Sequence, residues 1–127
     1  MDKAALVTVD PATGTKLLEA LDDSKLAISV ALWFNSAEYQ DWRFVLSSRR
    51  LDEAGPSNVY GLVHDALEKA GLSLRETPPL LILSMKEPFI RDLRRIFGKA
   101  KNVEGRRLGH QLIGDRFIED ALVYRIR

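Results

Sequence analysis

The stretch Leu26–Phe34 constrains the fold of this chain more than any other feature of its sequence. It is the longest apolar run and only Ser29 interrupts it. Because successive side chains of a strand point to opposite faces, both faces of such a strand are apolar or small. The sequence therefore predicts a central strand covered on both sides, with Ile28, Val30 and Leu32 deeply buried.

A second strand follows, in which Trp42, Phe44 and Leu46 alternate with Arg43, Val45 and Ser47. The short linker 35–41 predicts an antiparallel hairpin between the two strands. Trp33 and Trp42 are expected to pack as an aromatic pair across this hairpin, near Tyr39. If Tyr39 and Trp42 are instead partly exposed, they form a candidate partner surface.

Three further strands are predicted. Leu80–Leu83, after Pro78 and Pro79, is a short apolar run typical of a buried strand, with Leu81, Ile82 and Leu83 in the core. At the end of the chain, Leu108–Ile113 and Phe117–Ile126 flank Gly114 and Asp115, a pair typical of a hairpin turn.

Proline and glycine delimit two main helices, one between Pro56 and Gly71 and one between Pro88 and Gly98. Apolar residues recur in both at helical spacing. A short N-terminal helix is expected over 15–21, after Gly14, with Thr13 or Thr15 as its cap. The segments 48–55 and 99–105 are expected to be loops, and the Ser47–Arg50 cluster is expected to leave the sheet for solvent.

These elements predict a single α+β domain over residues 1–127. Its mixed sheet has about five strands, made of two hairpins and one buried strand, with the three helices packed on it. The right-handed crossover through the 56–70 helix would place the Trp42 strand and Leu80–Leu83 parallel to each other.

Composition excludes several function classes. The chain of 127 residues has no cysteine, which excludes disulfides, thiol catalysis and cysteine zinc sites. Neither a GxGxxG nor a GxxxxGK[ST] phosphate-binding motif occurs, and no cofactor is predicted. We find no export signal and no apolar run long enough to cross a membrane, so a cytoplasmic location is expected.

Two groups of residues are candidates for a catalytic or metal site. His64 has Glu68 one helical turn away, and His110 stands in an expected strand, but neither has metal-ligand spacing. The carboxylates Glu38, Asp41, Asp115, Glu119 and Asp120 are the candidates for a metal-dependent hydrolase. For both groups a structural or solvated role is the preferred interpretation, and no metal site is predicted.

Charge is unevenly distributed along the chain. The net charge is only +1, yet segment 86–107 holds eight basic and three acidic side chains. Glu87 and Asp92 can pair with Arg91 and Arg95 within the helix. Candidate nucleic-acid-binding residues are Arg91, Arg94, Arg95, Lys99, Lys101, Arg106 and Arg107.

The sequence predicts a binding or interaction module rather than an enzyme. The alternatives are a nucleic-acid-binding accessory protein that uses segment 86–107 and a metal-dependent hydrolase that uses the loop carboxylates. A homodimer is also expected, because the edges of a small sheet need covering.

Overall fold

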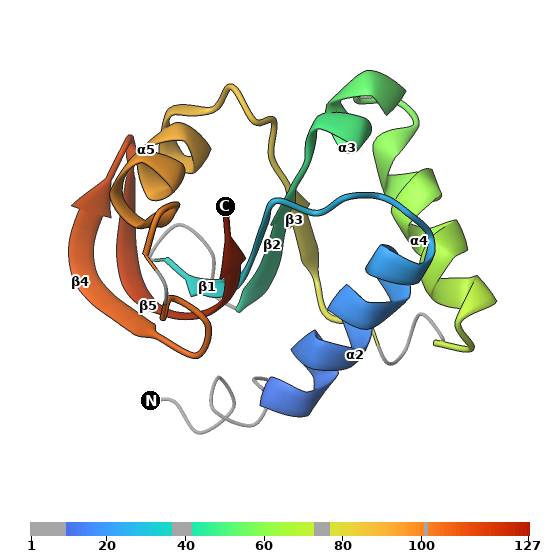
Figure 1. Cartoon of the computed structure of the whole chain (residues 1–127), viewed down its shortest axis with the longest axis horizontal. Coiled ribbons are helices and arrows are strands. Elements are labelled where there is room, and N and C mark those ends of the chain that lie inside the picture. Colours follow the sequence, from blue (N-terminus) through green and yellow to red (C-terminus); the bar gives the residue numbers. More distant parts are fainter. Residues whose placement is uncertain (1–9, 37–41, 73–76, 101) are drawn as a thin grey trace.

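The computed structural model describes residues 10–36, 42–72, 77–100 and 102–127. Within these ranges, four helices and five strands follow each other (Figure 1). The helices are α2 (Pro11–Asp23), α3 (Arg49–Ala54), α4 (Val59–Lys69) and α5 (Pro88–Phe97). The strands are β1 (Val30–Asn35), β2 (Arg43–Ser47), β3 (Leu80–Ile82), β4 (Arg107–Ile113) and β5 (Arg116–Ile126).

The five strands form one mixed sheet in the order β3-β2-β1-β5-β4. The predicted α+β class is confirmed, as are both antiparallel hairpins, β1–β2 and β4–β5. The predicted parallel pairing is also confirmed, because Val45 of β2 lies opposite Leu81 of β3. β3 and β4 are the edges of the sheet, so the Leu80–Leu83 strand is an edge strand.

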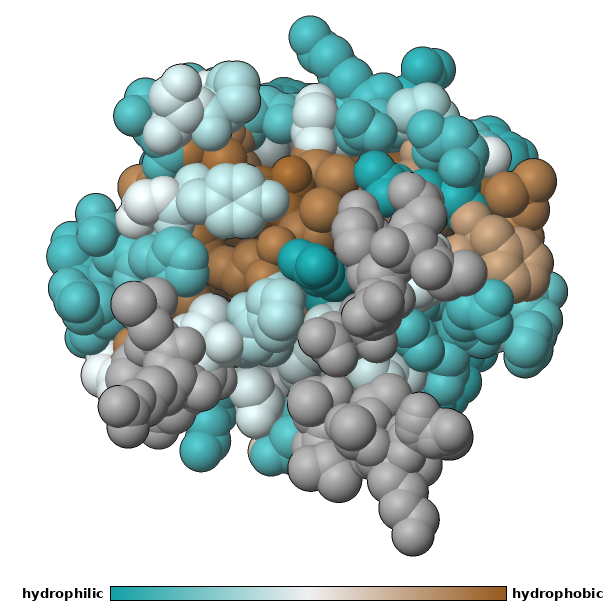
Figure 2. Space-filling view, turned by 180° about the vertical axis from the view of Figure 1, so that it is seen from behind, coloured by the Kyte–Doolittle hydropathy of each residue, from teal (hydrophilic) through white to brown (hydrophobic). Residues whose placement is uncertain are grey.

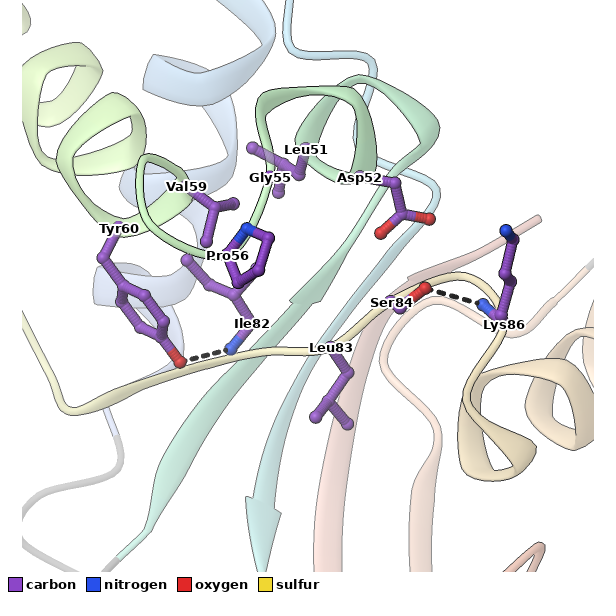
Figure 3. A pocket seen from close by; sticks show the side chains of 10 residues that line it. All are labelled: Leu51, Asp52, Gly55, Pro56, Val59, Tyr60, Ile82, Leu83, Ser84 and Lys86. Carbon is purple, nitrogen blue, oxygen red and sulfur yellow. Dashed lines mark hydrogen bonds between the residues drawn. The ribbon is translucent and has the colours of Figure 1, made fainter.

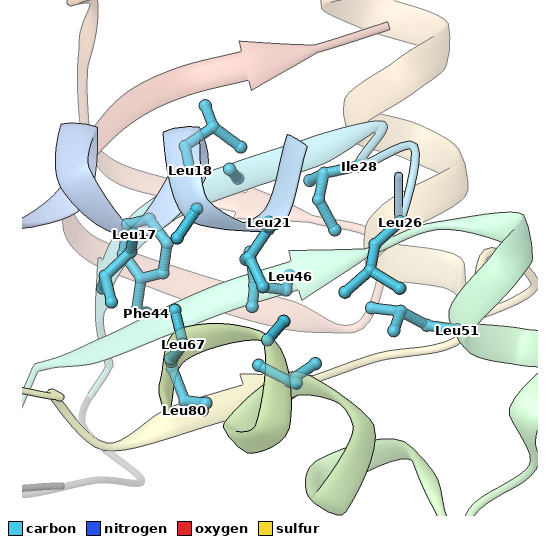
Figure 4. Packing of buried hydrophobic residues seen from close by; sticks show 14 of the residues in the cluster. Leu17, Leu18, Leu21, Leu26, Ile28, Phe44, Leu46, Leu51, Leu67 and Leu80 are labelled. Carbon is cyan, nitrogen blue, oxygen red and sulfur yellow. The ribbon is translucent and has the colours of Figure 1, made fainter. Parts of the chain in front are cut away.

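Two hydrophobic cores lie on opposite faces of the sheet, as the two apolar faces of the central strand predict. Ala31 and Trp33 of β1 face the core under α2 and α4, which Figure 4 shows from close by. Val30, Leu32 and Phe34 face the core under α5. All five side chains are almost completely buried. Figure 1 shows the corresponding layers, with α5 on one side of the sheet and α2 and α4 on the other.

The N-terminal helix is longer than predicted. It begins at Pro11, and the carboxylate of Asp10 caps it by accepting the N–H of Ala12 at 3.0 Å. Gly14 therefore lies inside the helix, where the ring of Tyr124 occupies the space that a Cβ would fill. The glycine marks a close contact between α2 and β5 rather than the start of the helix.

The prediction of a loop over residues 48–55 is wrong, because this segment contains helix α3. Ser47 and Ser48 are buried, and the Ser48 hydroxyl caps the helix by accepting the N–H of Leu51 at 3.0 Å. Leu51 is buried in the core that α2 and α4 cover. Helix α4 then begins at Val59, because residues 56–58 form a turn between the two helices.

Three packing predictions are corrected as well. Leu26 and Ile28 belong to the core under α2 and α4, opposite to Val30. They precede β1, which begins at Val30, and the positive φ of 53° at Ala27 shows that this segment is not extended strand. The aromatic partner of Trp33 across the hairpin is Phe44, at 5.3 Å between ring centroids, and not Trp42. Leu81 and Ile82 are only partly buried, since β3 is an edge strand.

None of the helices in the described ranges combines the length and the hydrophobicity that a membrane span requires.

Candidate functional site

A cavity of about 320 Å³ lies where the parallel strands β2 and β3 end. β2 leads into α3, and β3 leads into the segment before α5, so both connections border the cavity. The lining residues are Leu51, Asp52, Gly55, Pro56, Val59, Tyr60, Ile82, Leu83, Ser84 and Lys86 (Figure 3). Ligands of open α/β sheets commonly bind at this end of parallel strands.

Helix α3 forms the upper wall of the cavity in Figure 3. Leu51 anchors the helix in the core, and Asp52 follows it on the side that faces the segment after β3. One carboxylate oxygen of Asp52, Oδ2, accepts the backbone N–H of Met85 at 3.0 Å. This bond holds α3 against the segment after β3 and fixes the position of the carboxylate.

Tyr60 closes the other end of the cavity. Its hydroxyl oxygen accepts the backbone N–H of Ile82 at 3.1 Å. The next N–H, that of Leu83, points the opposite way and bonds to Leu46 of β2. Because N–H groups alternate in direction along a strand, Tyr60 satisfies a donor on the free edge of β3.

Polar groups gather at the end of the cavity away from Tyr60. The Ser84 hydroxyl accepts the backbone N–H of Lys86 at 3.1 Å, and the side chains of Asp52 and Lys86 extend beside it (Figure 3). Within the described part of the chain, the ion pairs formed involve neither Asp52 nor Lys86. Asp52 and Lys86 are both exposed to solvent, so a cation and an anion stand at one end of the cavity without forming an ion pair with each other.

The middle of the cavity is apolar. Leu51, Val59 and Ile82 supply aliphatic side chains from α3, α4 and β3, and the ring of Pro56 is also part of the lining (Figure 3). Figure 2 shows a hydrophobic area at the centre of the side seen from behind, framed by hydrophilic side chains. The cavity thus combines an apolar body with a charged end.

The predicted basic residues are partly engaged in contacts within the protein. Arg95 pairs with Asp92, as predicted, and Arg107 pairs with Asp120. Arg94 Nε donates to the backbone carbonyl of Arg127 at 2.9 Å. The guanidinium carbon of Arg106 lies 5.8 Å from the ring centroid of Phe97. Arg91 and Lys99 are exposed, and Lys101 lies outside the described residues.

The predicted partner surface at Tyr39 and Trp42 requires an exposed Trp42, but this side chain is buried. It is 3% exposed and belongs to the core under α2 and α4. Tyr39 lies outside the described residues. Among the described residues, the most exposed large apolar side chain is that of Leu112, directly opposite Phe117 on the β4–β5 hairpin.

The histidine and carboxylate candidates within the described ranges do not come together in a metal site. His64 is partly buried on α4, and its Nδ1 has no hydrogen-bond partner in the described structure. His110, Glu119 and Asp120 border one hollow on the β4–β5 hairpin, but Asp120 already pairs with Arg107. Glu38 and Asp41 lie outside the described residues. Across the described ranges, no three His, Asp or Glu side chains lie close enough to hold a metal ion.

Comparison with models of protein families, with curated proteins and with solved structures finds no match.

The sequence alone did not point to the cavity residues. Lys86 belongs to the basic segment 86–107, and Asp52 lies in segment 48–55, for which the sequence predicts a loop. One local pattern could have revealed α3, because Ser48 can cap a helix and Gly55 followed by Pro56 is typical of a helix end. The approach of Tyr60 to Ile82 joins residues that are far apart in the sequence, and only the fold produces it.

Proposed function

We propose that this protein is a binding module that holds a small amphipathic molecule in the cavity between α3, the start of α4 and β3. The observation that carries the proposal is the shape and chemistry of this cavity. Its volume of about 320 Å³ is at the lower end of the range of small-molecule sites. Its lining is apolar in the middle and charged at one end, and a ligand of matching character would leave neither part unsatisfied.

The walls of the cavity also support the proposal because they are held in place before any ligand arrives. Tyr60 is fixed by its bond to Ile82, and Asp52 by its bond to Met85. A preformed site loses less conformational entropy on binding than a site that has to be ordered. Rigid walls on helices and a strand are therefore what a binding module of this kind requires.

The test is a thermal-unfolding screen with small amphipathic molecules, including alkyl carboxylates, alkylamines and amino acids. A ligand that binds only the folded protein raises the melting temperature as its concentration increases. We expect at least one class of these molecules to do so. The variant Pro56→Trp, which places a much larger side chain in the lining of the cavity, should abolish the response.

Ile96→Trp is the matched control, because it adds the same side chain at a position that is 48% exposed and is not part of the cavity lining. It should respond to ligand as the wild type does. The proposal fails if no compound raises the melting temperature, or if Pro56→Trp responds as strongly as the control.

The proposal keeps the cytoplasmic location and the homodimer that the sequence predicts. The surface that favours self-association is the free edge of β4 with the exposed pair Leu112 and Phe117 beside it. Light scattering at micromolar concentration tests the dimer, since a mass near 14.3 kDa at every concentration rejects it. Leu112→Lys should weaken any association through this edge.

Nucleic-acid binding by segment 86–107 stays a prediction, and so does a hydrolase that uses the loop carboxylates. For the former, five phosphate contacts on duplex DNA would give a log–log salt slope of roughly −4 to −5. Changing Arg94 and Lys101 to Glu should then flatten the slope by about 2. Absence of binding at low salt would remove this alternative.

A further inference from the structure

We infer that the ligand of this cavity is a free α-amino acid with an apolar side chain. The inference rests on the proposed function and specifies its ligand. It comes from the arrangement of charge at the end of the cavity, where Asp52 and Lys86 both line the wall and form no ion pair with each other.

A ligand with a single charge does not match this arrangement. A carboxylate drawn to the ammonium of Lys86 would lie near the carboxylate of Asp52, and an amine drawn to Asp52 would lie near Lys86. In each case one contact attracts and the other repels. A zwitterion carries an ammonium and a carboxylate on one carbon atom, so it can satisfy both side chains together.

Asp52 and Ser84 each have a hydrogen-bonding atom left for the ammonium and carboxylate groups of a zwitterionic ligand. Oδ2 of Asp52 bonds to the N–H of Met85, which leaves Oδ1 to accept from a ligand ammonium. Ser84 accepts the N–H of Lys86 through its oxygen, so its own hydrogen can be donated to a ligand carboxylate. Both ends of the zwitterion thus find a charged partner, and the carboxylate finds a second donor.

The remainder of the cavity selects an apolar side chain. Leu51, Val59 and Ile82 surround the space between the charged end and Tyr60. A sugar or a polar amino acid would lose hydrogen bonds to water there without replacing them. An aliphatic side chain such as that of leucine gains from burial against the same surface.

The test compares leucine with two analogues that each lack one charge. Isocaproate lacks the ammonium of leucine, and isoamylamine lacks its carboxylate. Titration calorimetry on the full chain should show leucine binding at least about tenfold more tightly than either analogue, since each lost contact is a hydrogen bond between charged groups.

Two variants assign the contacts. Asp52→Asn keeps an oxygen for the N–H of Met85 but removes the charge, so it should abolish the advantage of leucine over isocaproate. Lys86→Met keeps the length of the side chain, and it should abolish the advantage over isoamylamine. Asp65→Asn and Lys99→Met make the same changes at exposed positions outside this cavity and should leave both ratios unchanged.

The outcomes separate the two proposals. Equal binding of leucine and both analogues, blocked by Pro56→Trp, overturns the zwitterion and leaves the proposed function standing. If only compounds other than amino acids bind to the cavity, the zwitterion is likewise overturned and the proposed function still stands. If neither leucine nor any compound in the screen binds, both proposals fail.

Discussion

Tyr124 on β5 lies directly against Gly14 of α2. A Cβ built on Gly14 would lie far inside van der Waals contact with Cζ of the Tyr124 ring. The hydroxyl of the same ring donates to the carbonyl oxygen of Pro11 at 2.7 Å. Glycine at position 14 therefore permits both the close approach of α2 to the sheet and the hydrogen bond that fixes the start of the helix.

Gly14→Ala should lower the free energy of unfolding by about 1–3 kcal/mol, because the new methyl group forces the Tyr124 ring out of its position. The change would otherwise favour a helix, since alanine is a better helix former than glycine. Gly61→Ala on α4 is the control, because its Cβ meets no atom within 4 Å. It should stabilise the protein by about 0.5–1 kcal/mol in the same urea titration. Equal effects at the two positions would contradict the packing of α2 on β5.

The bond from Tyr124 to Pro11 should make stability fall at alkaline pH. Burial raises the pKa of the Tyr124 hydroxyl above its ordinary value. A raised pKa in the folded state means that the stabilisation is complete below pH 10 and is lost as the pH rises through the folded pKa. Tyr124→Phe should lower stability by about 1 kcal/mol at neutral pH and reduce the alkaline loss. An alkaline profile identical to that of the wild type would show that this hydroxyl is not the group responsible.

The ion pair between Asp22 and Arg125 should contribute to stability in the opposite pH range. Two hydrogen bonds of 2.9 Å join the guanidinium of Arg125 to the carboxylate of Asp22, and Arg125 also donates to the carbonyl of Ile28. The hydrogen bond from Arg125 lowers the pKa of Asp22 below its ordinary value. The stabilisation is therefore present above about pH 4 and is lost as the pH falls through the lowered pKa.

Asp22→Asn should accordingly cost up to about 1 kcal/mol at neutral pH, a small figure because the pair is partly exposed to solvent. The difference from the wild type should shrink in acid, where Asp22 becomes protonated. Urea unfolding at pH 7 and at about pH 3 measures it. A difference that is constant between the two pH values would argue against an ionic contribution.

Val30→Asp should give an unfolded or insoluble protein. Val30 is 0% exposed in the core under α5, where a carboxylate would find neither water nor a cation. Ala12→Asp, an exposed change in the first turn of α2, should leave solubility and melting temperature nearly unchanged. A soluble Val30→Asp protein that melts with the wild type would show that the central strand has been placed wrongly.

Elements whose signal is local were predictable from the sequence. The two apolar faces of the Val30–Phe34 stretch predict a strand buried on both sides, and β1 lies at the centre of the sheet with a core on each face. Pro88 and Gly98 likewise predict α5, because proline and glycine act on the backbone next to them. The turn at Gly114 and Asp115 follows for the same reason.

Tertiary contacts decided the features that the sequence did not predict, namely the packing around Gly14 and the residues that form the cavity. From the sequence alone, Gly14 predicts that the helix starts after it. In the structure the glycine lies inside α2, because the ring of Tyr124 occupies the space next to it. The residues of the cavity come from α3, α4 and the segment after β3, and no local pattern relates Asp52 or Tyr60 to Lys86. Propensity and periodicity depend on neighbours within a few residues, so the sequence determined the strands and the main helices of this protein. Contacts such as that of Tyr60 with Ile82 depend on the order of the strands and on long-range packing, so only the tertiary structure assembled the candidate site.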